Sequence, residues 1–137
     1  MQRWRDLTAA SIIRWGRRSR SGFAAGVGVT PFLSWARHIE QTQDSTYQAT
    51  FYYCVHGRSD AVQYEEFERI AAQQVNLQVA LVCSEEQGHL RAADIGNLDD
   101  KDIFMCGPKS FTTDLQRQFL RLGVAGDRIH FEDFEFR

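Results

Sequence analysis

The sequence contains few of the residues that form disulfides or bind metal ions. Its 137 residues include three cysteines and four histidines, which are scattered, with no CxxC pair and no HExxH segment. An odd number of widely spaced cysteines argues against a disulfide framework and against a zinc site. We therefore expect no metal site, and a reducing, cytoplasmic setting is the natural one.

Long apolar runs and an excess of one charge are also missing. No apolar stretch approaches the roughly 20 residues that cross a bilayer, and the segment 11–13 is too short for a signal-peptide core. A formal net charge of -2 provides no global positive field for nucleic acid. We expect no nucleic-acid partner, and contact with a membrane only through a parent protein or a partner.

Residues 1–22 stand apart from the rest of the chain, because neither strand nor helix periodicity is sustained there. Arginine is concentrated in this segment, at Arg3, Arg5, Arg14, Arg17, Arg18 and Arg20. One interpretation is a basic arm for an anionic partner. The favoured one is a linker or the remnant of an upstream domain.

From residue 23 onward the sequence alternates between strand-like and helix-like segments. Strands are predicted over 50–55, 77–83, 102–106 and 128–131, and helices over 32–39, 64–71 and 111–122. Such alternation over one domain length predicts an α/β fold, a doubly wound parallel sheet of about five strands with helices on both faces. Residues 23–137 are accordingly expected to form a single domain.

The most informative segment is the glycine turn Gly26-Val27-Gly28-Val29-Thr30-Pro31. Glycine allows a tight backbone bend and the close approach of a ligand, and Pro31 suits the first turn of the helix that follows. Backbone N–H groups at the start of a helix attract anions. In an open α/β sheet, this position predicts binding of a pyrophosphate. A tight turn without a ligand explains the glycines equally well.

The order of motifs resembles the ferredoxin-NADP reductase superfamily. The glycine turn is followed by a strand ending in Gly57-Arg58, by Cys106-Gly107-Pro108, and by the terminal segment 131–134. Within that superfamily the chain looks most like the ferric reductase and NADPH oxidase branch. The resemblance implies the NAD(P)-binding domain of a flavin-dependent oxidoreductase, which delivers hydride from NADPH or NADH to FAD.

The resemblance also implies roles for the two loops. The turn from Gly26 to Pro31 would hold the pyrophosphate, with Thr30 near the nicotinamide. Gly107 and Pro108 would border the nicotinamide, and Cys106 would position the hydride-bearing carbon without covalent chemistry. Considered without the glycine turn, Cys106 is better explained as a small buried residue at a strand end.

Arg58 and Ser59 follow the second strand, where the family meets the adenosine ribose. An arginine fork and a serine hydroxyl suit a 2′-phosphate and so favour NADPH. Asp60 lies beside them, and an acidic residue favours the unphosphorylated ribose of NADH. A solvated turn is the alternative. Further along, His89 stands where the family has arginine.

The C-terminal tail completes the implied site. Phe134 matches an aromatic residue that lies against the flavin ring, and Glu132 lies close to where the reacting rings would meet. A plain final strand with a polar tail is the alternative for both. The family's flavin-binding barrel is not found in this sequence, so the resemblance implies a separate FAD-binding domain or flavoprotein partner, and low activity without it.

Two departures from the family pattern leave other functions open. The expected first strand begins with polar residues, Arg20-Ser21-Gly22, and Ala25 replaces a glycine. A degenerate nucleotide-binding fold that acts as an interaction module would account for both. A third interpretation is a subunit that pairs with a separately encoded flavin or membrane haem protein.

Overall fold

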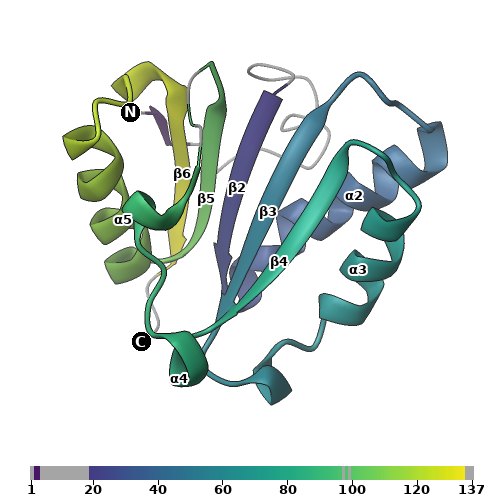
Figure 1. Ribbon diagram of the computed structural model, residues 1–137, viewed down its shortest axis with the longest axis horizontal. Coiled ribbons are helices and arrows are strands. Elements are labelled where there is room, and N and C mark those ends of the chain that lie inside the picture. Colours follow the sequence, from purple (N-terminus) through teal and green to yellow (C-terminus); the bar gives the residue numbers. More distant parts are fainter. Residues whose placement is uncertain (1, 4–18, 97, 99, 135–137) are drawn as a thin grey trace.

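Six parallel strands form one sheet in the order β1-β6-β5-β2-β3-β4 (Figure 1). The structure is a computed structural model and describes residues 2–3, 19–96, 98 and 100–134. The strands are β1 (Gln2–Arg3), β2 (Ser19–Ala25), β3 (Gln48–Val55), β4 (Leu77–Cys83), β5 (Asp102–Pro108) and β6 (Ile129–Phe134). Apart from the two-residue β1, this is the parallel sheet of about five strands that the sequence predicts.

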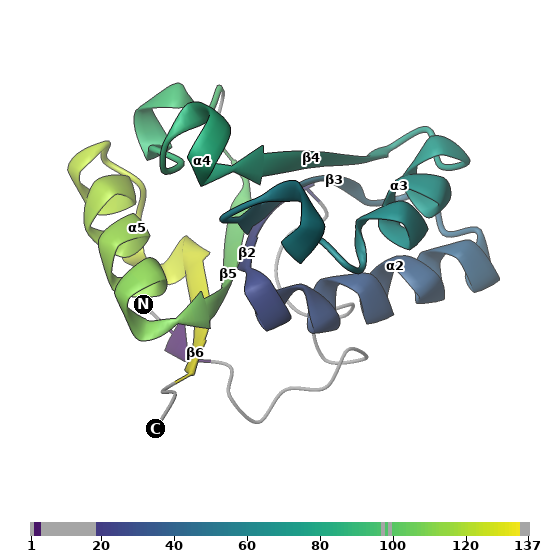
Figure 2. The same ribbon diagram turned by 90° about the horizontal axis from the view of Figure 1, so that it is seen from below.

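Helices connect the strands and cover both faces of the sheet, which confirms the doubly wound arrangement (Figure 2). The α-helices are α2 (Thr30–Thr42), α3 (Tyr64–Ala72), α4 (Ser84–Gln87) and α5 (Lys109–Arg121). Short 3-10 helices are η1 (Gly26–Val29), η2 (Arg58–Asp60), η3 (Ala92–Asp94) and η4 (Gly126–Arg128). Among the described residues, no helix combines the length and apolar character needed to cross a membrane.

Each face of the sheet carries its own hydrophobic core. Beneath α2 and α3, the ring of Phe51 packs against those of Phe32, Trp35 and Phe67. On the other face, Phe23 packs against Phe119 of α5. Because successive strand residues point to opposite faces, the neighbours Phe23 and Ala24 belong to different cores.

The polar start of β2 is accommodated inside the sheet. The strand begins at Ser19, ahead of the boundary expected at residue 23, and pairs with both β3 and β5. Arg20 is 2% exposed, and its guanidinium carbon lies 4.6 Å from the ring centroid of Tyr47 and 5.0 Å from that of Phe104. Such cation–π contacts help a buried arginine to occupy a strand position. Of the segment 1–22, residues 1 and 4–18 lie outside the described part of the chain, so its interpretation as an arm or a linker stays a prediction.

The chain changes direction across the sheet between β2 and β5. It runs outward from β2 through β3 to β4, and then crosses to β5 and β6 on the other side of β2. The carboxyl ends of β2 and β5 therefore form the topological switch point, where open α/β sheets bind ligands. The glycine turn follows β2, and β5 itself ends with Cys106, Gly107 and Pro108.

Candidate nucleotide-binding site

The glycine turn forms the short helix η1 and leads directly into α2. Gly26 has a φ of 58°, in the left-handed region where glycine carries no Cβ penalty. Val27 is 62% exposed, and Pro31 lies in the first turn of α2, which has no acidic residue there. The exposed turn, with no acidic side chain and no side-chain cap at the start of α2, is a suitable site for an anion.

Gly28 lies against the segment that ends β5. A Cβ atom on Gly28 would overlap the carbonyl oxygen of Cys106. The absence of a side chain here thus permits a contact between two segments of the chain, and the close approach of a ligand to Gly28 stays a prediction. Ala25, which replaces a family glycine, has an ordinary φ of -118°, and its Cβ packs beside Gly107. The two loops expected to border the coenzyme do meet.

Cys106 is fully buried between the strands that end at this edge. Burial, followed by the nearby charge of Glu132, raises the pKa of its thiol to about 12. Cys106 and Glu132 are register partners on β5 and β6. The thiol is protonated at neutral pH, as expected for a residue that packs and positions without becoming covalent. Phe134 ends β6, but its side chain lies outside the described part of the structure.

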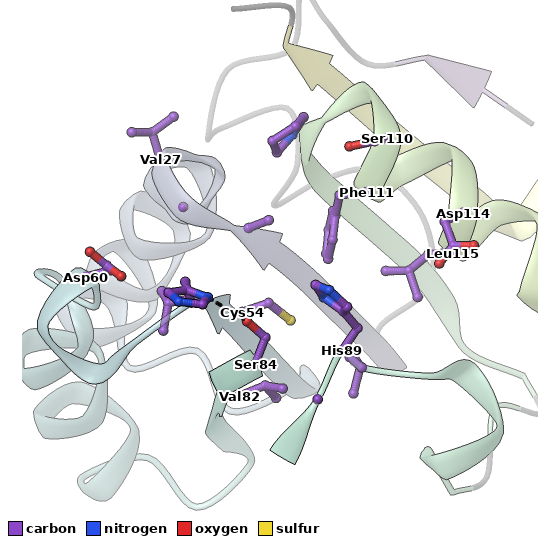
Figure 3. A pocket seen from close by; sticks show the side chains of 17 residues that line it. Val27, Cys54, Asp60, Val82, Ser84, His89, Ser110, Phe111, Asp114 and Leu115 are labelled. Carbon is purple, nitrogen blue, oxygen red and sulfur yellow. Dashed lines mark hydrogen bonds between the residues drawn. The ribbon is translucent and has the colours of Figure 1, made fainter. Parts of the chain in front are cut away.

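A cleft of about 660 Å³ opens between the glycine turn and the start of α5 (Figure 3). Its walls are Ala25, Gly26, Val27, Cys54, Val55, His56, Asp60, Val82, Ser84, Gly88, His89, Leu90, Pro108, Ser110, Phe111, Asp114 and Leu115. Of the predicted site residues, Gly26, Val27 and Pro108 are therefore in the cleft wall. Gly28, Cys106 and Gly107 lie directly behind that wall.

The ends of β3 and β4 form the far side of the cleft. His56 Nδ1 lies 3.3 Å from Ser84 Oγ, and the backbone N–H of Glu85 donates to the carbonyl of His56 at 3.0 Å. The carboxylate of Asp60 accepts a 3.0 Å hydrogen bond from the backbone N–H of Gly57. Asp60 is thereby fixed where it also lines the cleft.

Arg58 and Ser59 do not line the cleft. Arg58 is instead paired with Glu86, with 3.0 Å between Nε and a carboxylate oxygen, and its side chain is 72% exposed. The hydrogen bond and charge of Glu86 raise the pKa of Arg58. Asp60 therefore lines the cleft and Arg58 does not. The sequence had suggested opposite coenzyme preferences for these two residues, NADPH for Arg58 and NADH for Asp60.

Several residues of the cleft were missed by sequence reasoning. Ser110, Phe111 and Asp114 lie in the first two turns of α5 (Figure 3). Ser84 and His56 directly follow strands. The feature of the sequence that could have identified them is their position, because each lies at or just beyond the carboxyl end of a parallel strand. Within the described ranges, no group of three or more His, Cys, Asp and Glu side chains could hold a metal ion.

Comparison with known proteins agrees with this geometry. Residues 23–117 match the family described as the oxidoreductase NAD-binding domain. The chain is 30% identical over 112 residues to the carnitine monooxygenase reductase subunit of Escherichia coli, covering 81% of this chain and 33% of that protein. It is also 30% identical over 117 residues to the flavohemoprotein of Vibrio cholerae, covering 81% of this chain and 29% of that protein.

A solved structure shows the same fold. The FAD/NAD-binding domain of nitric oxide dioxygenase from Vibrio cholerae superposes with a TM-score of 0.74 at 26% identity, over 88% of this chain and 52% of that one. The chain thus spans about a third of the length of these curated relatives. With the turn, the switch point and the matched residues in agreement, this chain belongs to the oxidoreductase NAD-binding domain family.

Proposed function

We propose that the chain binds a reduced pyridine nucleotide in the cleft and presents its hydride to a flavin held by another domain. The observation that carries this proposal is the meeting of the glycine turn with the Cys106–Pro108 loop, beside a cleft of about 660 Å³. That volume lies within the range of small-molecule and cofactor sites. The cleft also lies at the switch point, where ligands of open α/β sheets bind.

The residues of the chain act by binding and orientation. Backbone N–H groups of the turn would receive the pyrophosphate, with the exposed Thr30 hydroxyl beside them. Gly107 and Pro108 would border the nicotinamide, and the buried Cys106 would hold that edge in shape by packing. When bound, the nucleotide supplies the hydride, so the protein contributes mainly position and electrostatics.

The flavin-facing edge is part of the same proposal. Glu132 lies beside Cys106 on the neighbouring strand, and Phe134 lies beside Pro108. We propose that these two residues face the flavin-binding domain, Phe134 by contact with the ring. A ferric reductase-like electron acceptor stays a prediction, since the named relatives are flavohemoproteins and reductases of other kinds.

For the coenzyme, the cleft favours NADH. Among the described residues that line it, none is lysine or arginine, whereas Asp60 and Asp114 contribute carboxylates. The additional charge of a 2′-phosphate would be repelled by these carboxylates. This interpretation replaces the preference for NADPH that the sequence drew from Arg58, because Arg58 is paired outside the cleft wall.

Calorimetric titration of the purified chain with NADH, and in parallel with NADPH, tests the proposal. Val27→Asp places a carboxylate on the exposed turn, so we expect at least about a tenfold loss of affinity for either nucleotide. Val75→Asp is the matched control, because Val75 is 95% exposed and does not line the cleft. A folded chain that binds neither nucleotide, or equal losses in the two variants, would overturn the proposal.

A further inference from the structure

We propose that Glu86 sets the coenzyme specificity of the chain by holding Arg58 away from the 2′-phosphate of NADPH. The inference rests on the proposed function and assigns a discriminating residue to the same site. Glu86 belongs to α4, which follows β4, whereas Arg58 belongs to the loop after β3. The discrimination therefore depends on a contact between two separate strand ends.

The contact between these side chains occupies Nε, one of the guanidinium donors through which arginine can bind a phosphate side-on. Arg58 Nε lies 3.0 Å from one carboxylate oxygen of Glu86 and 3.2 Å from the other. Arginine binds a phosphate through parallel N–H donors. With Nε already donating to Glu86, a 2′-phosphate must displace a carboxylate to obtain the same bond. The 2′-hydroxyl of NADH requires no such exchange.

Glu85 holds α4 in the position from which Glu86 reaches Arg58. The backbone N–H of Glu85 donates to the carbonyl of His56 at 3.0 Å. A Cβ atom on Gly57 would come within 3.0 Å of Glu85 Oε1, so the carboxylate of Glu85 lies closely over a residue that has no side chain. The two loops are thus joined next to the Arg58–Glu86 pair, through His56, Gly57 and Glu85.

The charges around this pair disfavour a second anion. Asp60 lines the cleft from the same loop as Arg58, and Glu85 and Glu86 add two more carboxylates against a single guanidinium. The ion pair itself is exposed and therefore weak. Its effect on specificity comes from neutralising the only arginine of this loop, so that a phosphate gains little by approaching.

A double-mutant cycle on the complete chain tests this inference. The quantity measured by calorimetry is the ratio of the dissociation constants for NADPH and NADH, so a general loss of affinity cancels. In Glu86→Gln, we expect the ratio to fall by about threefold to fivefold, because the exposed ion pair that competes with the phosphate is worth at most about 1 kcal/mol. Arg58→Ala alone should leave the ratio within about twofold, because Arg58 contributes little while it is paired.

The double variant Arg58→Ala with Glu86→Gln identifies the mechanism. We expect it to lose the gain in NADPH affinity, since no guanidinium remains. Asp127→Asn is the control for a change in net charge, because Asp127 is exposed before β6, at the opposite end of the strands. An unchanged ratio in Glu86→Gln, or a gain that persists without Arg58, would overturn the inference while NADH binding continued to support the proposed function. Absence of binding of either nucleotide by the folded wild-type chain would overturn both.

Discussion

Asp102 and His130 form a buried pair on neighbouring strands, with 3.1 Å between Oδ1 and Nε2 and side chains only 5% and 4% exposed. The neutral imidazole can donate its Nε2 proton to the carboxylate. Burial lowers the pKa of His130, and it outweighs the opposing effect of Asp102. The pair therefore links the stability of the β5–β6 half of the sheet to pH.

We predict that the free energy of unfolding falls as the pH decreases below about 6.5, the ordinary pKa of histidine. A group whose pKa is lowered on folding takes up its proton first in the unfolded chain, so acidification favours unfolding. One such group contributes a slope of at most about 1.4 kcal/mol per pH unit. Urea unfolding at pH 7.5, 6.5 and 5.5 measures it. A His130→Gln variant should show a flatter dependence, and an equal slope in both proteins would contradict the assignment.

Gly28→Ala should destabilise the chain and weaken nucleotide binding together. Its Cβ atom would overlap the backbone of Cys106, and relief of such overpacking costs about 1–3 kcal/mol. Thermal unfolding and calorimetry measure the two effects. Gly96→Ala is the matched control, since a Cβ there meets nothing within 4 Å and Gly96 lacks a positive φ. Similar stability of the two variants would show that the loop contact is not required.

The three free cysteines should resist alkylation in the folded chain. Burial raises the pKa of Cys54 and of Cys106 to about 12, and it also raises that of Cys83. Because the thiolate is the reactive form, iodoacetamide at pH 8 should label all three rapidly only after denaturation. Mass spectrometry of native and urea-treated samples reports each site. Rapid native labelling of Cys106 would contradict a packing function and indicate a reactive one.

The isolated chain should not retain flavin or oxidise NADPH or NADH at enzymatic rates. Its described residues form the nucleotide-binding sheet, and the proposal assigns the flavin to another domain. Absorbance near the flavin bands and a nucleotide-oxidation assay test this expectation. Stoichiometric FAD in the purified chain, together with rapid turnover, would show that the flavin site is built from residues given no such function here.

Much of the fold could be predicted because its signals are local. Apolar periodicity located β3, β4, β5 and the three longer helices, and the glycine turn located the switch point. The polar start of β2 was harder to interpret, since its compatibility with a strand depends on Tyr47 and Phe104, which are distant in sequence. The pairing of β2 on both sides removes the polar first strand as an argument for a degenerate fold.

Site residues could be predicted only where a single continuous segment carries a recognisable binding motif. The turn and the Cys-Gly-Pro loop could be identified from the sequence, whereas the contact of Gly28 with Cys106 could not. The environment of Arg58 depends on Glu86, a residue of a different loop. The order of the strands in the sheet determines which loops touch. The local sequence pattern of one loop does not identify the other loop that it contacts.

The crossover places β2–β3–β4 and β5–β6 on the two sides of one strand pairing, that of β2 with β5, and the chain connects them through the segment between β4 and β5. The cleft takes its walls from both sides of this pairing, so a molecule bound there would contact both sides at once. Any ligand that binds only the joined form favours that form by mass action. Nucleotide concentration should therefore govern how often the two sides of the β2–β5 pairing separate.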